Sequence, residues 1–248
     1  MWKNISTDKI GSFIERHFGT KGQQALLGQN RPAITISRQE GAGGLTVASY
    51  LAEYMQSHTG SREEWTVFSQ HIVAKVLEEH KYDKRIGDFM KEDHKGSLMD
   101  SIEEFLGLHP STWTLVEQTN DIIMKLARIG NVILVGRGAN IVTSQLPNVY
   151  HVHLVGSLEK RIEQAMKVFN LDQKAAAHYI DKKDAARKRY IKDNFHRDIN
   201  DPLLYHVVIN TDFTAHDQAA RLIGTEVITR FELNSAVRVN VRQAAYAS

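Results

Sequence analysis

Residues 34–46, ITISRQEGAGGLT, run from a short β-branched segment into glycines and then into an expected helix. In such a strand–loop–helix turn, glycines allow backbone N–H groups to converge on an anion, and the dipole of the following helix favours negative charge. The stretch therefore predicts a phosphate-binding loop over residues 38–44. An ordinary glycine-rich turn is the alternative, because short motifs often match by chance.

The loop lacks one cation that nucleotide-binding loops usually carry. Their signature is G-x-x-x-x-G-K-[ST], in which the lysine contacts the terminal phosphates and the hydroxyl binds Mg²⁺. This chain has Thr46 for the hydroxyl, but Gly44 stands where the lysine is expected. We expect Arg38, at the mouth of the loop, to supply part of the missing charge through its planar guanidinium. The competing interpretation is that Arg38 pairs with Glu40 and that the loop binds phosphate weakly.

The composition is that of an ordinary globular protein. A chain of 248 residues can bury a substantial core, which favours one α/β domain with an appended subdomain. The absence of cysteine excludes disulfides, thiolate catalysis and cysteine-bound zinc. We find no secretory signal and no apolar run that could cross a bilayer, so we expect a cytoplasmic protein with no membrane partner. A net charge of +2 is too small to indicate a dedicated nucleic-acid binder.

Short apolar segments alternate with helical periodicity along the chain. This order predicts βαβ units and a mainly parallel, doubly wound sheet. Strands are expected at Ala33–Ser37, Trp65–Phe68, Val132–Val135, Val149–Val155 and Tyr205–Asn210. Helices are expected over residues 45–55, over 111–128 with Ser111 as N-cap, over 157–168 with Ser157 as N-cap, and around an apolar face of Ala219, Leu222, Ile223 and Val227.

Other segments do not fit a minimal five-stranded unit. Within a core domain of residues 31–231, we expect a helical insertion over 69–130 and a polar helix with little apolar face over 171–195. Both could close over the crevice beyond the carboxyl ends of the strands. Residues 1–30 form an expected helical extension that could pack on the core or make a homo-oligomer, and residues 232–248 form a tail.

Arg137 follows the expected third strand within the sequence Gly136-Arg137-Gly138. A strand end at this position places the guanidinium at the carboxyl edge of the sheet, where its fork suits a phosphate or a carboxylate. A surface arginine in a turn is the alternative.

On the polar helix, Ile180, Asp184, Arg187 and Ile191 fall at i, i+4, i+7 and i+11, which is one helical face. Asp184 can therefore orient Arg187. The commoner explanation of such a pair is a solvated salt bridge. The functional interpretation is a mobile lid that delivers arginines to a transferring phosphoryl group and excludes water.

Two further patterns favour structural over functional roles. His151 and His153 alternate on one strand face, as in a two-histidine metal site, but without an apparent third ligand we expect ordinary core or surface histidines. The segment from Asp181 to Lys192 carries six basic residues against two acids. A basic helix could touch nucleic acid, yet no helix-turn-helix, finger or aromatic RNA-binding signature is present, so this function ranks last.

Four motifs, in this order, resemble those of the cytidylate-kinase-like family of P-loop proteins. They are ITISRQEGAGGLTVA at residues 34–48, NVILVGRGAN at 131–140, D-x-x-R-x-x-Y at Asp184, Arg187 and Tyr190, and LLYHVVINTD at 203–212. The resemblance covers roughly residues 32–228. It implies a P-loop NTPase-type three-layer sandwich with a five-stranded parallel sheet, a helical insertion that binds the acceptor nucleotide, and a helical lid.

The same resemblance implies an ATP- and Mg²⁺-dependent phosphotransferase that acts on a nucleoside monophosphate, with CMP and dCMP among the candidates, or on a similar small acceptor. Arg137 would contact the acceptor or the transferring phosphate, and Arg187, held by Asp184, would act from the lid. The donor phosphates and the Mg²⁺ at Thr46 would be bound by the loop residues Gly41, Ala42, Gly43, Gly44, Leu45 and Thr46.

The chain also departs from the true cytidylate kinases. They carry Gly-Lys where this chain has Gly43-Gly44, and Asp where it has Gly138. A nucleotide- or phosphate-binding regulatory module without kinase activity is therefore the alternative function.

Overall fold

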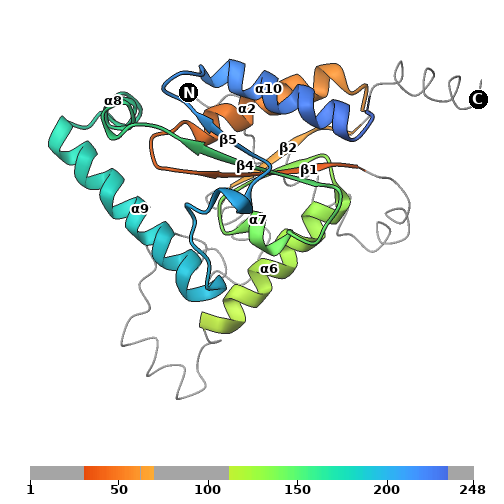
Figure 1. Cartoon of the computed structure of the whole chain (residues 1–248), viewed down its shortest axis with the longest axis horizontal. Coiled ribbons are helices and arrows are strands. Elements are labelled where there is room, and N and C mark those ends of the chain that lie inside the picture. Colours follow the sequence, from red (N-terminus) through yellow and green to blue (C-terminus); the bar gives the residue numbers. More distant parts are fainter. Residues whose placement is uncertain (1–30, 62, 70–111, 234–248) are drawn as a thin grey trace, which may run out of the picture.

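The structure is a computed structural model that describes residues 31–61, 63–69 and 112–233 (Figure 1). The expected N-terminal extension, much of the expected insertion, the proposed cap Ser111 and nearly all of the expected tail lie outside these residues.

Five strands form one sheet in which every neighbouring pair is parallel. They are β1 (Ala33–Arg38), β2 (Thr66–Ser69), β3 (Val132–Val135), β4 (Val149–Val155) and β5 (Val207–Asn210), in the order β2-β3-β1-β4-β5. The predicted α/β fold with a parallel sheet is confirmed, with strand ends within two residues of those expected. Because the strand order reverses at β1, the crevice beyond its carboxyl end is the place where such sheets bind ligands.

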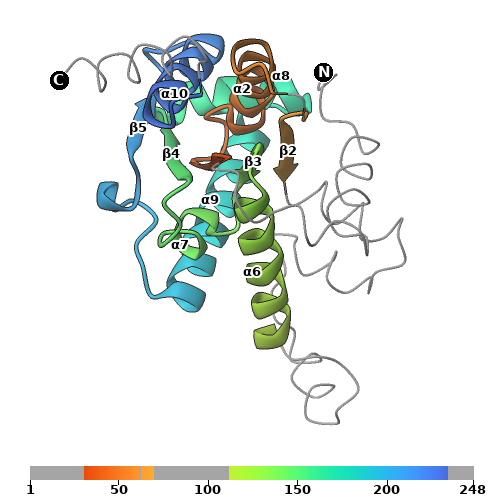
Figure 2. The same ribbon diagram turned by 90° about the vertical axis from the view of Figure 1, so that its right-hand side faces the viewer.

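Two helices cover one face of the sheet. α2 (Gly44–His58) and α10 (His216–Arg230) lie side by side in both ribbon views (Figures 1 and 2). Together with alternate strand residues such as Ile36 and Leu154 they bury the larger apolar cluster, in which Leu51 and Ile223 are almost fully buried. Aliphatic burial of this kind fixes the start of α2, and hence the glycine loop, on the sheet.

The opposite face is covered by α6 (Thr112–Ile129) and the short α7 (Ala139–Val142) (Figure 1). Their apolar cluster includes Ile123 and Leu126 of α6, and Ala33 and Leu134 of the sheet. None of the helices in the described ranges is long and apolar enough to cross a membrane.

Three further elements lie between β4 and β5 in the chain. They are α8 (Leu158–Phe169), α9 (Gln173–Phe195) and the 3-10 turn Pro202–Leu204. α9 runs past the carboxyl ends of β1 and β4 (Figure 1). Ser157 caps α8, as expected, by accepting a hydrogen bond from the Lys160 N–H at 3.4 Å. Asp172 caps α9 in the same way.

The structure corrects two details of the helix predictions. α9 was expected to have little apolar face, but it buries Ala176, Ala186 and two isoleucines, and Ala176 packs with Ile180 against α8. The expected face Ile180–Asp184–Arg187–Ile191 is the side that packs, because a helix laid across a sheet edge must bury one stripe. On α10, Leu222 was expected in the apolar face but is 59% exposed, because the helix turns Ala219, Ile223 and Val227 inward instead.

Candidate functional site

The glycine loop connects β1 to α2 at the carboxyl edge of the sheet. Its turn is closed by a hydrogen bond from the Ala42 N–H to the Gln39 carbonyl at 3.2 Å. Gly43 is the N-cap of α2 with φ of 81°, and the His216 ring lies where a side chain at this position would be. Only glycine fits both conditions. A glycine cap offers no side-chain acceptor, so the positive end of the helix dipole faces the loop.

Arg38 lies against Gly44. The Cγ and Cδ atoms of Arg38 are 3.0 and 3.2 Å from the position that a Cβ on Gly44 would take. A lysine at position 44 would therefore require Arg38 to move. Arg38 thus lies beside the point at which the side chain of the missing lysine would begin, which gives the expected compensation a geometric basis. Glu40 was the alternative partner for Arg38, but the Glu40 carboxylate pairs with Arg187.

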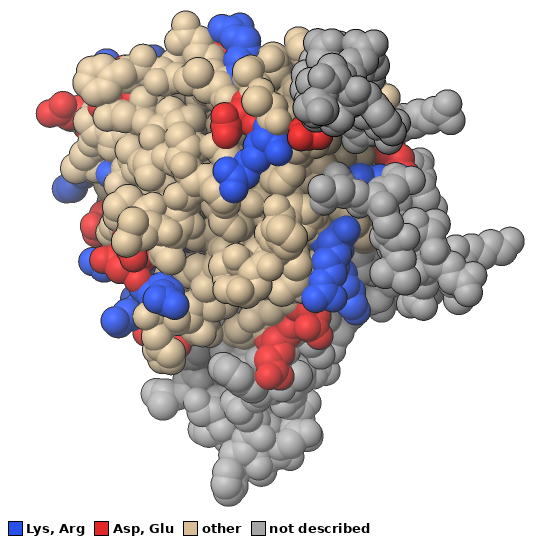
Figure 3. Space-filling view, turned by 45° about the vertical axis from the view of Figure 1, so that its right-hand side comes forward, with Lys and Arg blue, Asp and Glu red and all other residues tan. Residues whose placement is uncertain are grey.

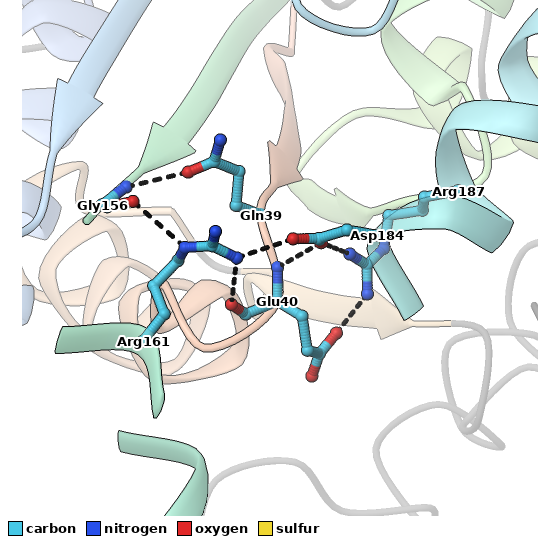
Figure 4. Close-up of polar contacts among 6 residues, drawn as sticks. All are labelled: Gln39, Glu40, Gly156, Arg161, Asp184 and Arg187. Carbon is cyan, nitrogen blue, oxygen red and sulfur yellow. Dashed lines mark hydrogen bonds and ion pairs between the residues drawn. The ribbon is translucent and has the colours of Figure 1, made fainter. Parts of the chain in front are cut away.

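Four residues at the mouth of the loop form a charge cluster, defined as Glu40, Arg161, Asp184 and Arg187 (Figure 4). The Asp184 carboxylate accepts from Arg161 Nη1 at 2.6 Å and from Arg187 Nη1 at 2.8 Å. It also accepts from the Glu40 N–H at 2.8 Å. The second Nη of Arg187 pairs with the Glu40 carboxylate. The cluster joins the glycine loop to α8 and α9, and its two arginines balance its two carboxylates.

Arg161 is a residue that sequence reasoning missed. Its Nε donates to the Gly156 carbonyl at 3.0 Å and its Nη1 to the Glu40 carbonyl at 3.1 Å, so it ties the end of β4 to the loop. The residue is only 9% exposed. Its position could have indicated this role. Arg161 lies in the first turn of the helix that follows β4, at the edge of the sheet that also carries the glycine loop.

Arg187 is buried, with 5% exposure, where a solvated salt bridge was the commoner expectation. It pairs with Glu40 of the loop and with Asp184 of its own helix. Arg187 therefore contributes to the attachment of α9 to the loop, which a solvated salt bridge would not do.

Arg137 has an unusual backbone conformation. Its φ of 57° lies in the left-handed region that non-glycine residues rarely adopt, and the residue is 6% exposed. Its guanidinium carbon lies 4.9 Å from the centroid of the Tyr190 ring of α9, a cation–π contact. Such strain persists where the surroundings enforce it, and it clusters at functional sites.

Three hollows meet at Arg38. A cleft of about 90 Å³ lies between the glycine loop and α8, and it is lined by Gly41, Gly43, Gly44, Leu45 and Thr46. A cleft of about 340 Å³ lies between α9 and His153 of β4, and a small hollow of about 20 Å³ reaches Arg137 and Tyr190. Arg187 borders the second and third. The fold thus gathers Arg38, Arg137, Asp184 and Arg187 around the loop, whereas the Ala42 side chain packs into the apolar cluster.

Buried histidines lie below the same edge. His151 and His153 are 6% and 4% exposed, and burial lowers the pKa of each to about 4. His206 lowers the pKa of His151 further, whereas the Ser37 backbone and Asp184 oppose the shift at His153. Burial also lowers the pKa of His216 beside Gly43. These rings are therefore neutral at neutral pH. Within the described ranges, no three His, Asp or Glu side chains are grouped as a metal site.

Comparisons with known proteins place these features in a family context. A family model described as "Cytidylate kinase-like family" matches residues 33–213. The chain is similar to the crystal structure of an uncharacterized protein from Eubacterium ventriosum ATCC 27560, with 19% identity and a TM-score of 0.58, over 79% of this chain and 98% of that one. It is less similar to the structure of TT1252 from Thermus thermophilus, with 13% identity and a TM-score of 0.42, over 79% and 97%. No curated protein matches the sequence.

Proposed function

Because the chain belongs to the cytidylate kinase-like family, we propose that it transfers a phosphoryl group from ATP to a nucleoside monophosphate or a similar small acceptor. CMP and dCMP are the first acceptors to test. The observation that carries the proposal is the position of Arg38, whose side chain lies over Gly44 and borders all three hollows. Phosphoryl transfer depends on positioned cations around the transferring group, and this arrangement supplies them.

Each candidate residue has a role in this proposal. The amides of the glycine loop and of the first turn of α2 bind the donor phosphates, and Arg38 provides the charge that a lysine supplies elsewhere. Arg137 contacts the acceptor or the transferring group. Arg187, oriented by Asp184, stabilises the charge that develops during transfer. Residues 171–195 act as the lid, and the segment 69–130 is the proposed acceptor-binding side.

The residues present fit a Mg²⁺ ion. Thr46 lines the cleft beside the loop, and a hydroxyl oxygen is a ligand that Mg²⁺ accepts. Mg²⁺ usually keeps several waters and takes other ligands from substrate phosphates, so the Thr46 hydroxyl would be one ligand among these. When bound, the ion would neutralise charge on the donor phosphates.

Ligand binding and turnover test the proposal separately. ATP with Mg²⁺ should raise the free energy of unfolding by about 2.7 kcal/mol at a hundredfold excess over Kd, measured as a shift of the thermal midpoint. A screen of nucleoside monophosphates that reads ADP release then tests turnover. No thermal shift at millimolar ATP would contradict nucleotide binding itself.

Arg38 can be tested by two substitutions. Arg38→Ala should weaken triphosphate binding more than monophosphate binding, and Arg38→Lys should restore little, because a point charge cannot reproduce a bidentate contact. Equal affinities in the parent and in Arg38→Ala would remove Arg38 from this role.

A binding module without kinase activity is the second candidate function. The glycine at position 44 and the engagement of Arg187 by Glu40 favour it, since both remove cations from the phosphate site. This function predicts nucleotide binding without ADP release for every acceptor tested. On the face in Figure 3, basic and acidic side chains are scattered, and no patch of basic residues alone gathers there.

A further inference from the structure

Glu40 places a carboxylate on an arginine that is expected to meet phosphate. Its side chain is 17% exposed, borders the loop cleft and pairs with Arg187, whose side chain is 7% exposed. Arg187 borders the two neighbouring hollows, so it stands between the glycine loop and the space under α9. Any phosphate that enters the loop approaches an arginine that already has an anionic partner.

The backbone of Glu40 is fixed independently of its side chain. Its N–H donates to Asp184 Oδ1 at 2.8 Å, and its carbonyl accepts from Arg161 Nη1 at 3.1 Å. The carboxylate can therefore swing away while the loop keeps its place. Arg187 would retain its bond to Asp184, at 2.8 Å, throughout such a movement.

The charges of the cluster favour an exchange in which a phosphate replaces Glu40 as the partner of Arg187. The cluster holds two arginines and two carboxylates, so a phosphate that joins it adds excess negative charge next to Glu40. The negative charges of the phosphate and of the Glu40 carboxylate repel each other strongly where water is partly excluded. If the phosphate replaces the Glu40 carboxylate on Arg187, one ion pair breaks and another forms, while Glu40 moves to the solvated cleft.

We propose that Glu40 is an internal competitor of phosphate: its carboxylate holds Arg187 until a phosphate group of the ligand displaces it, and Glu40 thereby sets the affinity for polyphosphates. This inference rests on the proposed function only in that phosphate binds at the glycine loop. It does not depend on the identity of the acceptor or on turnover.

Glu40→Gln is the direct test, because glutamine keeps the shape and removes the charge. By isothermal titration calorimetry with Mg²⁺ present, the variant should bind ADP and inorganic pyrophosphate about tenfold more tightly than the parent does. The matched control is Glu63→Gln, since Glu63 is also a partly buried partner of an arginine, Arg31, but precedes β2 at the opposite edge of the sheet. This control should bind both ligands as the parent does.

A double variant separates exchange of partners from simple repulsion. In an Arg187→Gln background, the gain from Glu40→Gln should vanish, because no arginine remains to be released. A persistent tenfold gain in that background would overturn the exchange. Glu40→Asp keeps the charge and can be used where the other variants do not fold. Its affinity for ADP and pyrophosphate should stay within about threefold of that of the parent. A tenfold gain in affinity in this variant would also overturn the proposal.

The remaining outcomes distinguish this inference from the proposed function. If the parent binds ADP and pyrophosphate and folded Glu40→Gln binds them no better, the competitor role is wrong and phosphate binding at the loop stands. If neither the parent nor Glu40→Gln binds either ligand, both proposals are wrong. If Glu40→Gln binds the ligands and the parent does not, Glu40 prevents phosphate binding altogether, which would support the competitor role.

Discussion

The two sides of strands β1 and β4 differ sharply. On one side, Ile34, Ile36, Val152 and Leu154 pack against α2 and α10. On the other side, the alternating residues are Thr35, Ser37, His151 and His153, all of them buried, and the hollows under α9 open above them. The same two strands therefore carry an aliphatic side, which we call the apolar side, and a polar side below the hollows. The charge cluster borders these hollows through Asp184 and Arg187, and we group it with the polar side.

The two sides are therefore held together by different interactions. Apolar burial holds α2 and α10 on the sheet, whereas hydrogen bonds and ion pairs hold the candidate site together. Burial of aliphatic groups is non-directional, and no ligand can take its place. Hydrogen bonds and ion pairs are directional, and a phosphate can replace one of the partners. Substitutions on the apolar side should therefore change stability, whereas substitutions on the polar side should change both the binding of ligands and the response to pH and salt.

The largest effect of a single substitution is expected on the apolar side. Leu51→Ala removes a fully buried side chain of α2 and should lower the free energy of unfolding by about 3 kcal/mol. Urea-induced unfolding measures the loss. Leu222→Ala on α10 is the control, because Leu222 is 59% exposed and should change stability by less than about 0.5 kcal/mol. If Leu51→Ala remained stable but lost affinity for ADP, the proposed separation of the two sides would be wrong.

Acid should destabilise the polar side. The pKa of His151 and of His153 is about 4 in the folded chain, below the ordinary value of 6.5. Between these values the unfolded chain binds more protons, so the free energy of unfolding falls as the pH falls from 6.5 towards 4. The loss should be about 2 kcal/mol per histidine by pH 5. Well above pH 6.5 these histidines cause no further change in the free energy of unfolding.

A neutral replacement tests that assignment. His151→Gln cannot gain a proton, so its stability should fall less steeply than that of the parent between pH 6.5 and 5. The comparison uses urea unfolding curves at several pH values for both proteins. Parallel pH dependences would show that His151 does not carry the shift.

Arg187→Ala should have a smaller effect on stability, about 1.5 kcal/mol. The substitution leaves Glu40 and Asp184 without the arginine that they share, in surroundings that are only partly solvated. Salt screens such partly exposed pairs, so the difference between parent and variant should shrink at 1 M NaCl. Arg221→Ala removes a pair whose two side chains are 57% and 50% exposed, and it should cost less than about 0.5 kcal/mol. Equal stability of Arg187→Ala and the parent would restore the view of a solvated pair.

Local patterns predicted the apolar side better than the polar side. Short β-branched runs predicted the five strands of the described sheet. The order of strand, glycines and helix predicted the glycine loop, and helical spacing predicted that Asp184 and Arg187 share a face. Glu40 and Arg161 could not be predicted in this way, because they meet across 121 residues and neither belongs to a periodic pattern. The close approach of the Arg38 side chain to Gly44 also depends on a side-chain direction that the sequence does not encode locally.

The smallest effect is expected where Tyr190 of α9 meets Arg137, in the turn after β3. Tyr190→Leu removes the ring that lies 4.9 Å from the Arg137 guanidinium and should cost about 1 kcal/mol in stability. The consequence for binding should be clearer, because Arg137 keeps its left-handed backbone only while its surroundings hold it. Affinity for a nucleoside monophosphate should therefore fall in Tyr190→Leu, while affinity for pyrophosphate at the glycine loop should stay unchanged. Tyr190→Phe keeps the ring face and should retain both affinities. If Tyr190→Leu weakened the binding of the two ligands equally, Arg137 would not act on the acceptor in particular, and its proposed contact with the acceptor would have to be given up.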